Sequence, residues 1–193
     1  LTGTIRRDGF SGFAKNKKSA YFPSAGLAWV LSEENFWNDA NMLNYVKLRA
    51  SYGSNGNTVS RYSSLALVSR SNQYIFDGQS VLGQYISSLA NNDLSWEKTN
   101  SYNFGVDFGL FDNKVMTNID YYTSKTTDLI WALALPQLTG FSSITSNVGE
   151  IDNEGIEVSL HANNIVNTPA FKWSFDLFFD SNRNKIKKLV GLD

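Results

Sequence analysis

This 193-residue chain contains no cysteine and carries almost no surplus of either charge, and these two absences are the most informative. The sequence contains no cysteine, which excludes disulfide frameworks, thiolate metal sites and cysteine nucleophiles. Seventeen basic and 18 acidic residues give a formal net charge of −1, whereas proteins that bind nucleic acid normally carry a strong basic surplus. We therefore expect no nucleic-acid partner.

Histidine and proline are also scarce, with one His and three Pro. The scarcity of proline excludes collagen-like and proline-rich disordered chains. No Ser-His-Asp triad can be argued from the single histidine, His161, and a metal site needs several convergent ligands. The abundant carboxylates leave a glycosidase pair open by count alone, but no phosphate-binding glycine motif occurs. We expect no enzyme activity, no metal and no cofactor.

The sequence has no apolar run of about 18 residues, so it predicts no transmembrane helix. A membrane protein remains compatible with this absence, because barrel strands alternate apolar and polar residues and keep a low mean hydropathy. No signal peptide opens the chain, since Leu1 to Arg7 already alternates like a strand. We expect the natural N-terminus of an exported protein to lie upstream.

Alternation with a period of two residues is the main positive signal. Along Ser101 to Leu110, for example, Tyr102, Phe104 and Val106 fall on one face while Asn103, Gly105 and Asp107 fall on the other. The same reasoning predicts seven strands, at 1–7, 20–31, 45–54, 97–111, 114–125, 151–162 and 170–182. Several reach the roughly 9–11 residues of a tilted membrane strand, whereas soluble strands are commonest at about 5–6 residues.

The predicted connections differ in length in an alternating manner. The long loops are 8–19, 55–96 and 126–150. The short connections are 163–169 and a two-residue turn at Asp112-Asn113. The connection 32–44 is intermediate, with a possible helical turn over Glu33 to Asn41. Long loops at one end and short turns at the other are typical of outer-membrane barrels, and structureless loops of about 20 residues are unusual in compact soluble domains.

Aromatic residues gather at both ends of the apolar faces, as in the interfacial girdles of membrane barrels. The group at the short-turn end comprises Trp29, Tyr45, Phe108, Phe111, Phe171 and Trp173, and the group at the other end comprises Tyr21, Tyr52, Tyr102, Tyr121 and Phe179. These features predict an all-β fold, an antiparallel up-and-down meander of long strands that forms part of a transmembrane β-barrel. The residues expected to face its lumen include Asp107, Asp120, Glu157, His161 and Asp176.

Three aromatic residues of the long loops, Tyr74, Tyr85 and Trp131, are candidates for stacking on a sugar or contacting a peptide. Loops on a rigid scaffold commonly carry function, although ordinary packing within the loops explains such residues equally well.

Several motifs resemble, in order, those of the SusC/RagA family of TonB-dependent outer-membrane transporters. They are DGFSGF at 8–13, YFPSAGLAW at 21–29, SEENF at 32–36, LRASYGSNGN at 48–57, the stretch from Trp96 to Asn113, and NVGEIDNEGIE at 147–157. Phe10 and Gly12 depart from the family pattern, which often has Ser and Arg there. Each motif is weak alone, but together they cover nearly the whole chain.

The resemblance implies a plugged barrel of about 22 strands. Residues 1–193 would then be part of a TonB-dependent receptor barrel domain, with the plug, the signal peptide and the final strands absent. It further implies a nutrient importer in the outer membrane of a Gram-negative, Bacteroidetes-like cell, taking up oligosaccharides or peptides. The implied partners are outer-membrane lipid, the TonB system through the missing N-terminal region, and a SusD-like surface lipoprotein.

Two alternatives remain open at the level of the sequence. A passive porin-like barrel would share the strand pattern but lack a plug and a TonB-contacting segment. A soluble carbohydrate-binding β-sandwich would bury the apolar faces against a second sheet, and alternation alone does not distinguish it from a barrel.

Overall fold

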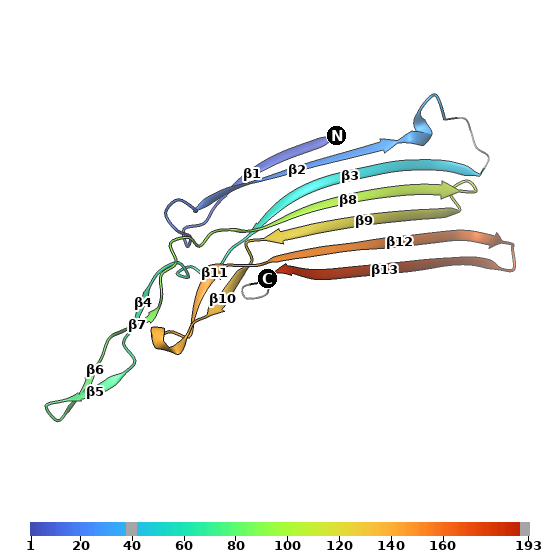
Figure 1. The fold of residues 1–193 in the computed structure, drawn as a ribbon. Helices are drawn as coiled ribbons and strands as arrows, with labels where there is room; N and C mark the ends of the chain where they lie inside the picture. The colour runs from blue at the N-terminus through green and yellow to red at the C-terminus, as the bar shows by residue number, and fades with distance from the viewer. Residues whose placement is uncertain (38–41, 190–193) are drawn as a thin grey trace.

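A computed structural model describes residues 1–37 and 42–189. Seven long strands form one antiparallel sheet in the order β1-β2-β3-β8-β9-β12-β13 (Figure 1). Their bounds are β1 Thr2–Gly9, β2 Ser19–Val30, β3 Leu43–Asn57, β8 Glu97–Leu110, β9 Val115–Thr127, β12 Glu150–Asn167 and β13 Lys172–Lys188. Each strand pairs with the next long strand along the chain, so the predicted meander and fold class are confirmed.

The strand register places the apolar residues of neighbouring strands side by side. Trp29 is opposite Leu48, Leu48 opposite Val106, and Val106 opposite Ile119. The same row continues through Val158 to Phe179. Because side chains alternate across a strand, one face of the sheet, here called the apolar face, is continuous over six strands. The polar residues between them form the opposite, polar face.

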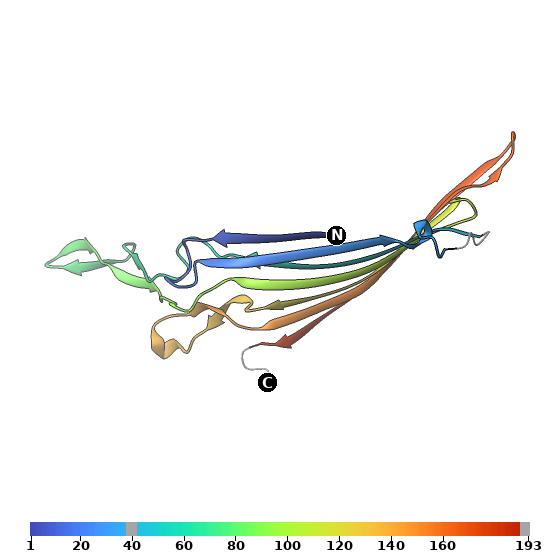
Figure 2. The same ribbon diagram turned by 90° about the horizontal axis from the view of Figure 1, so that it is seen from above.

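No second layer covers the apolar face within the described residues, as both views of the ribbon show (Figures 1 and 2). Its large side chains are therefore exposed, with Leu27 at 54%, Phe104 at 53% and Leu177 at 52%. A β-sandwich would cover these groups with a second sheet, so the described structure does not support that alternative. The part of the chain that is described contains no helix long and apolar enough to cross a membrane.

The hairpin turns differ from the sequence prediction. The β8–β9 connection is a four-residue turn, 111–114, and not a two-residue turn, because β8 ends at Leu110 and β9 begins at Val115. Phe111, Asp112 and Asn113 have φ values of 54°, 57° and 60°, and the side chain of Asn44 on β3 accepts a 2.7 Å hydrogen bond from the Asp112 amide. The β12–β13 turn is 168–171, so Phe171 lies in the turn and not on a strand.

The long loops contain short strands that alternation did not predict. β4 (Leu67–Ser69) pairs with β7 (Tyr85–Ser88), β5 (Gln73–Phe76) with β6 (Gln79–Leu82), and β10 (Ile130–Ala134) with β11 (Ser143–Asn147). These hairpins extend from one end of the sheet, and the short turns lie at the other (Figure 1). A 3-10 helix, η2, spans Gln137–Thr139.

The helical turn expected over Glu33 to Asn41 is only partly visible. A 3-10 helix, η1, spans Leu31–Glu33 and begins two residues earlier than expected. Residues 38–41 lie outside the described part of the chain.

The main buried cluster lies at the long-loop end and joins β2 to the loops. It consists of Phe13, Ala20, Phe22, Leu94 and Trp96. Trp96 stands with its ring centroid 5.2 Å from Phe13 and 5.5 Å from Phe22. Buried aromatic pairs of this kind contribute about 0.5–1.5 kcal/mol beyond the burial of their area. The cluster therefore anchors loops 10–18 and 58–96 to the sheet.

Candidate functional site

The polar face carries all five acidic or histidine side chains that the sequence placed in a lumen. On β8, β9, β12 and β13 these polar positions alternate along each strand with the residues of the apolar face. They are Asp107, Asp120, Glu157, His161 and Asp176. The register sets Asp120 opposite Glu157, and His161 opposite Asp176. The sheet thus gathers these residues on one surface.

Arg49 on β3 is the centre of this surface. Its Nη2 atom lies 2.7 Å from Asp107 Oδ1 and 2.8 Å from Asp120 Oδ2, and its Nε donates to Asp107 at 3.0 Å. Asn118 also donates to Asp107, at 2.9 Å. The arginine side chain is 30% exposed and those of Asp107 and Asp120 are 11% and 20% exposed. One guanidinium therefore joins three neighbouring strands and neutralises two carboxylates that would otherwise repel each other.

Gly105 makes this arrangement possible. A Cβ atom there would lie 2.6 Å from Arg49 Cζ and 2.6 Å from Asp120 Oδ1. The guanidinium thus lies directly over the backbone of β8, where a larger residue would displace it. Sequence reasoning did not identify Arg49, although its place between Leu48 and Ala50 already put it on the polar face.

Near the short-turn end, His161 forms a second polar contact. Its Nδ1 atom lies 2.8 Å from Asp176 Oδ1, and the Phe178 ring packs edge-on at 5.4 Å from the imidazole. Both polar side chains are exposed. The described residues contain no group of three or more His, Asp or Glu side chains arranged to hold a metal ion.

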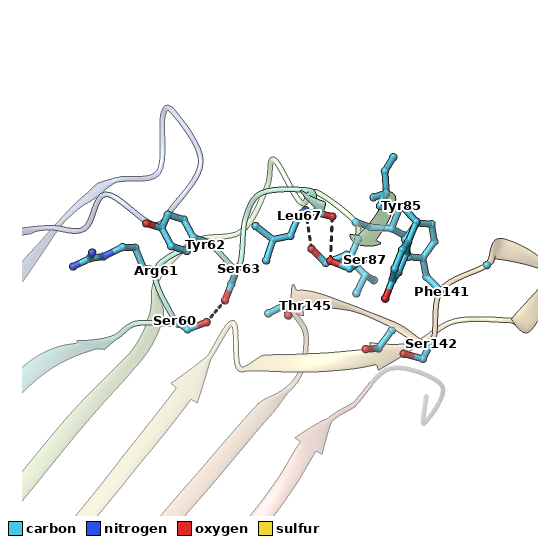
Figure 3. Close-up of a pocket in the computed structure, with 16 residues that line it drawn as sticks. Ser60, Arg61, Tyr62, Ser63, Leu67, Tyr85, Ser87, Phe141, Ser142 and Thr145 are labelled. Atoms are coloured by element: carbon cyan, nitrogen blue, oxygen red, sulfur yellow. Dashed lines mark hydrogen bonds between the residues drawn. The ribbon is translucent and has the colours of Figure 1, made fainter. Parts of the chain in front are cut away.

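At the opposite end, the long loops enclose a cleft of about 660 Å³ (Figure 3). Three segments line it: Ser60–Ser63 with Leu67, Tyr85–Leu89, and Gly140–Thr145. Figure 3 shows Tyr85 and Phe141 together at one end and Arg61 and Tyr62 at the other. None of these lining residues except Tyr85 was predicted, because contacts between distant loops leave no periodic signal in the sequence.

Hydrogen bonds hold the segments of this loop cleft in place. Ser60 and Ser63 share a 2.7 Å hydrogen bond, and the Ser87 hydroxyl donates to the Leu67 carbonyl at 3.1 Å. Asn147 connects two loops, since its side chain accepts from the Ser95 amide at 2.7 Å and donates to the Asp128 carbonyl at 2.9 Å. The walls are therefore linked through polar contacts to the end of the sheet.

The three loop aromatics do not meet. Tyr85 lines the cleft, whereas Tyr74 lies on the separate β5–β6 hairpin and Trp131 lies on β10, outside the lining. Hydrogen bonds from Ser71 and Ser69 lower the pKa of the Tyr85 phenol. Exposed aromatic rings can stack on a polar ligand while neighbouring hydroxyl groups form hydrogen bonds with it.

The similarities to known proteins agree with this geometry. The family profile described as TonB dependent receptor-like, beta-barrel matches residues 1–186. The chain is 43% identical over 194 residues to TonB-dependent receptor P3 of Formosa agariphila, covering 100% of this chain and 19% of that protein. It is 37% identical over 201 residues to TonB-dependent receptor SusC of Bacteroides thetaiotaomicron, covering 100% of this chain and 20% of that protein.

A solved structure described as the RagAB peptide transporter superposes with a TM-score of 0.86 at 34% identity, covering 98% of this chain and 21% of that one. The chain thus spans about a fifth of the length of the relatives it matches. From the family profile, these identities and the shared fold, the chain belongs to the TonB-dependent receptor-like β-barrel family and is of the SusC/RagA type.

Proposed function

We propose that these residues form part of the wall of an outer-membrane transporter that imports nutrients such as oligosaccharides or peptides. The observation that carries the proposal is the contrast between the two faces of the sheet. One face exposes Trp29, Phe104 and Leu177 without a covering layer, while the other holds the Arg49–Asp107–Asp120 network. Such a sheet suits lipid on one side and a polar lumen on the other.

The proposed transporter contains this chain as one part of its barrel domain. The remaining strands and a plug domain would be supplied by other parts of a longer protein, as the short span relative to the relatives suggests. Import would be driven through the TonB system, and a SusD-like surface lipoprotein would deliver the substrate. The chain itself would have no enzymatic role.

The loop cleft is the proposed point at which this chain first contacts the cargo that the lipoprotein delivers. In this orientation the long loops lie at the cell surface, and the cleft opens among them. Its mixture of serine hydroxyls with Tyr62, Tyr85 and Phe141 suits a sugar or a peptide backbone.

Location and transport are tested with the full-length protein in its own cell. We expect recovery of the protein with the outer-membrane fraction, and loss of growth on a particular oligosaccharide or peptide when the gene is deleted. Recovery in the soluble periplasm would refute the proposal. Continued uptake after removal of TonB would instead favour the passive porin-like barrel.

The role of the cleft is tested by Tyr85→Ala, with Tyr74→Ala as the matched control on the neighbouring hairpin. Loss of one aromatic contact costs about 0.5–1.5 kcal/mol. The substrate concentration that gives half-maximal uptake should therefore rise roughly two- to tenfold. The Tyr74 variant should transport normally, because Tyr74 does not line the cleft. Equal effects of both substitutions would contradict this assignment.

A further inference from the structure

The β10–β11 hairpin supplies one wall of the loop cleft without being part of the long sheet. Its strands form a separate two-stranded sheet, and its segment Gly140–Thr145 lines the cleft (Figures 1 and 3). The chain enters the hairpin at Asp128 and leaves it at Gly149, with φ values of 55° and 99°. Positive φ values bend the backbone away from the extended conformation, so the hairpin does not simply continue β9 and β12. Its direction therefore depends on contacts made by side chains.

Asn147, the last residue of β11, makes such contacts. Its side-chain oxygen accepts a hydrogen bond from the Ser95 amide at 2.7 Å, and its side-chain nitrogen donates to the Ser95 carbonyl at 2.9 Å. The same nitrogen donates to the Asp128 carbonyl at 2.9 Å. A carboxamide that bonds both backbone groups of one residue fixes two segments as a pair of ladder hydrogen bonds does. Ser95 directly precedes Trp96 of the buried cluster, so Asn147 ties β11 to an anchored part of the chain.

Asn91 makes a second connection, which joins two walls of the cleft. Its side-chain nitrogen donates to the Thr145 carbonyl at 2.8 Å, and its backbone amide donates to the Ser64 carbonyl at 3.1 Å. Its side-chain oxygen accepts from the Asp93 amide at 2.9 Å, which holds the carboxamide in place. Asn91 therefore links the β10–β11 wall to the wall that contains Ser63 and Leu67.

The base of β10 is attached in a similar way. Glu97 Oε2 accepts from the Ile130 amide at 3.0 Å, and Glu97 Oε1 accepts from the Asn57 side chain at 3.3 Å. The Ile130 side chain packs against the buried cluster. These partners belong to β3, β8 and the connection between β9 and β12, and each of these strands is paired on both sides. The attachment thus lies in the interior of the sheet and not at its edges.

We propose that Asn147 and Asn91 are positioning residues that set the β10–β11 wall at a fixed distance from the other walls, and thereby set the affinity of the cleft for its cargo. The inference rests on the proposed function, in which the cleft binds the cargo. A wall held in place before binding loses little conformational entropy when the cargo arrives, whereas a mobile wall must be ordered at that moment. The described lining of the cleft includes neither asparagine, so they act through geometry.

The position of the wall is tested in the full-length protein in detergent. Nitroxide labels on Arg61→Cys and Ser142→Cys, two exposed positions on opposite walls, report the distance across the cleft by pulsed electron paramagnetic resonance. We expect one narrow distance distribution, which Asn147→Ala should broaden at least about twofold because the hairpin is released. Asn91→Ala removes the other link and should also broaden it, which keeps the test decisive if Asn147→Ala does not fold.

Asn44→Ala is the matched control. Asn44 also accepts a 2.7 Å hydrogen bond from a distant backbone amide, that of Asp112, but it lies at the short-turn end of the sheet. This variant should leave the distance distribution unchanged. Equal broadening by Asn44→Ala, or an unchanged distribution in both Asn147→Ala and Asn91→Ala, would overturn the inference.

Uptake supplies the readout that a general loss of stability would not reproduce. The probe is the oligosaccharide or peptide on which growth fails after deletion of the gene. Asn147→Ala should raise the concentration that gives half-maximal uptake roughly two- to tenfold and leave the maximal rate unchanged. A lower maximal rate with unchanged half-saturation would overturn the inference but not the proposed function. Recovery of the wild-type protein in the soluble periplasm would instead refute the proposed function itself.

Discussion

Phe10 and Gly12 depart from the family pattern at neighbouring positions, and the structure shows that the two residues fit each other. Phe10 packs edge-on against Phe13 with ring centroids 5.0 Å apart. A Cβ atom at Gly12 would collide with the Phe10 ring and lie 2.8 Å from the Arg61 carbonyl oxygen. A larger residue at position 12 is therefore incompatible with phenylalanine at position 10.

This contact predicts that Gly12→Ala lowers the stability of the full-length barrel by about 1–3 kcal/mol, the usual cost of overpacking a filled site. Stability is measured by heating samples to a series of temperatures before gel electrophoresis and recording the temperature at which the folded band disappears. Gly9→Ala is the matched control, since nothing lies within 4 Å of a Cβ atom there. Gly12→Ala should cost less stability in a Phe10→Ser background than in the wild type, because the ring is then absent while the Arg61 carbonyl oxygen still opposes the added Cβ atom. An unchanged Gly12→Ala variant would contradict the contact.

Arg49 is expected to matter more for stability than either carboxylate it binds. Arg49→Gln leaves Asp107 and Asp120 partly buried and without a positive partner. This should lower the stability of the full-length barrel by about 1–3 kcal/mol, measured by the thermal loss of the folded band. Adding Asp107→Asn and Asp120→Asn should recover most of this loss, because the repulsion is then removed. If Arg49→Gln unfolds at the wild-type temperature, the network does not support the sheet.

At the scale of the element, alternation located all seven long strands but not their ends. The prediction for β13 stopped at residue 182, whereas the strand continues to Lys188. From Asn182 onward both faces carry mainly polar residues, so the contrast between faces that identifies a strand disappears. The turn at 111–114 was misjudged because Phe111, an apolar residue that continues the strand pattern, adopts a positive φ of 54°.

Because adjacent residues of a strand face opposite environments, substitutions at adjacent positions should differ sharply. Leu177 lies on the apolar face and Phe178 on the polar face, where it contacts His161. Leu177→Arg should cost about 2–4 kcal/mol if it is near the middle of the membrane, whereas Phe178→Arg should be tolerated. Thermal loss of the folded band in the full-length protein measures both, and the reverse order would mean that the faces are wrongly assigned.

At the scale of the whole molecule, the sequence indicated which face is polar but not how its residues connect. Asp107 and Asp120 could be placed by alternation, since that is a local property of each strand. Their link through Arg49 spans 58 and 71 residues of sequence and depends on the register of three strands. The loop cleft likewise depends on Ser63, Tyr85 and Phe141 meeting across separate segments, which no local pattern encodes.

An open sheet of this kind predicts the behaviour of residues 1–193 on their own. The edges β1 and β13 have no strand partner in the described structure, and the apolar face has no cover. Unpaired edges template association, and a large apolar patch favours it further. We expect the isolated polypeptide to aggregate without detergent, as measured by light scattering and size-exclusion chromatography. Detergent should reduce aggregation because it covers the apolar face, although the two edges stay open. A stable monomer that unfolds cooperatively in plain buffer would mean that the apolar face is buried within the chain itself, and the lipid-facing assignment would fail.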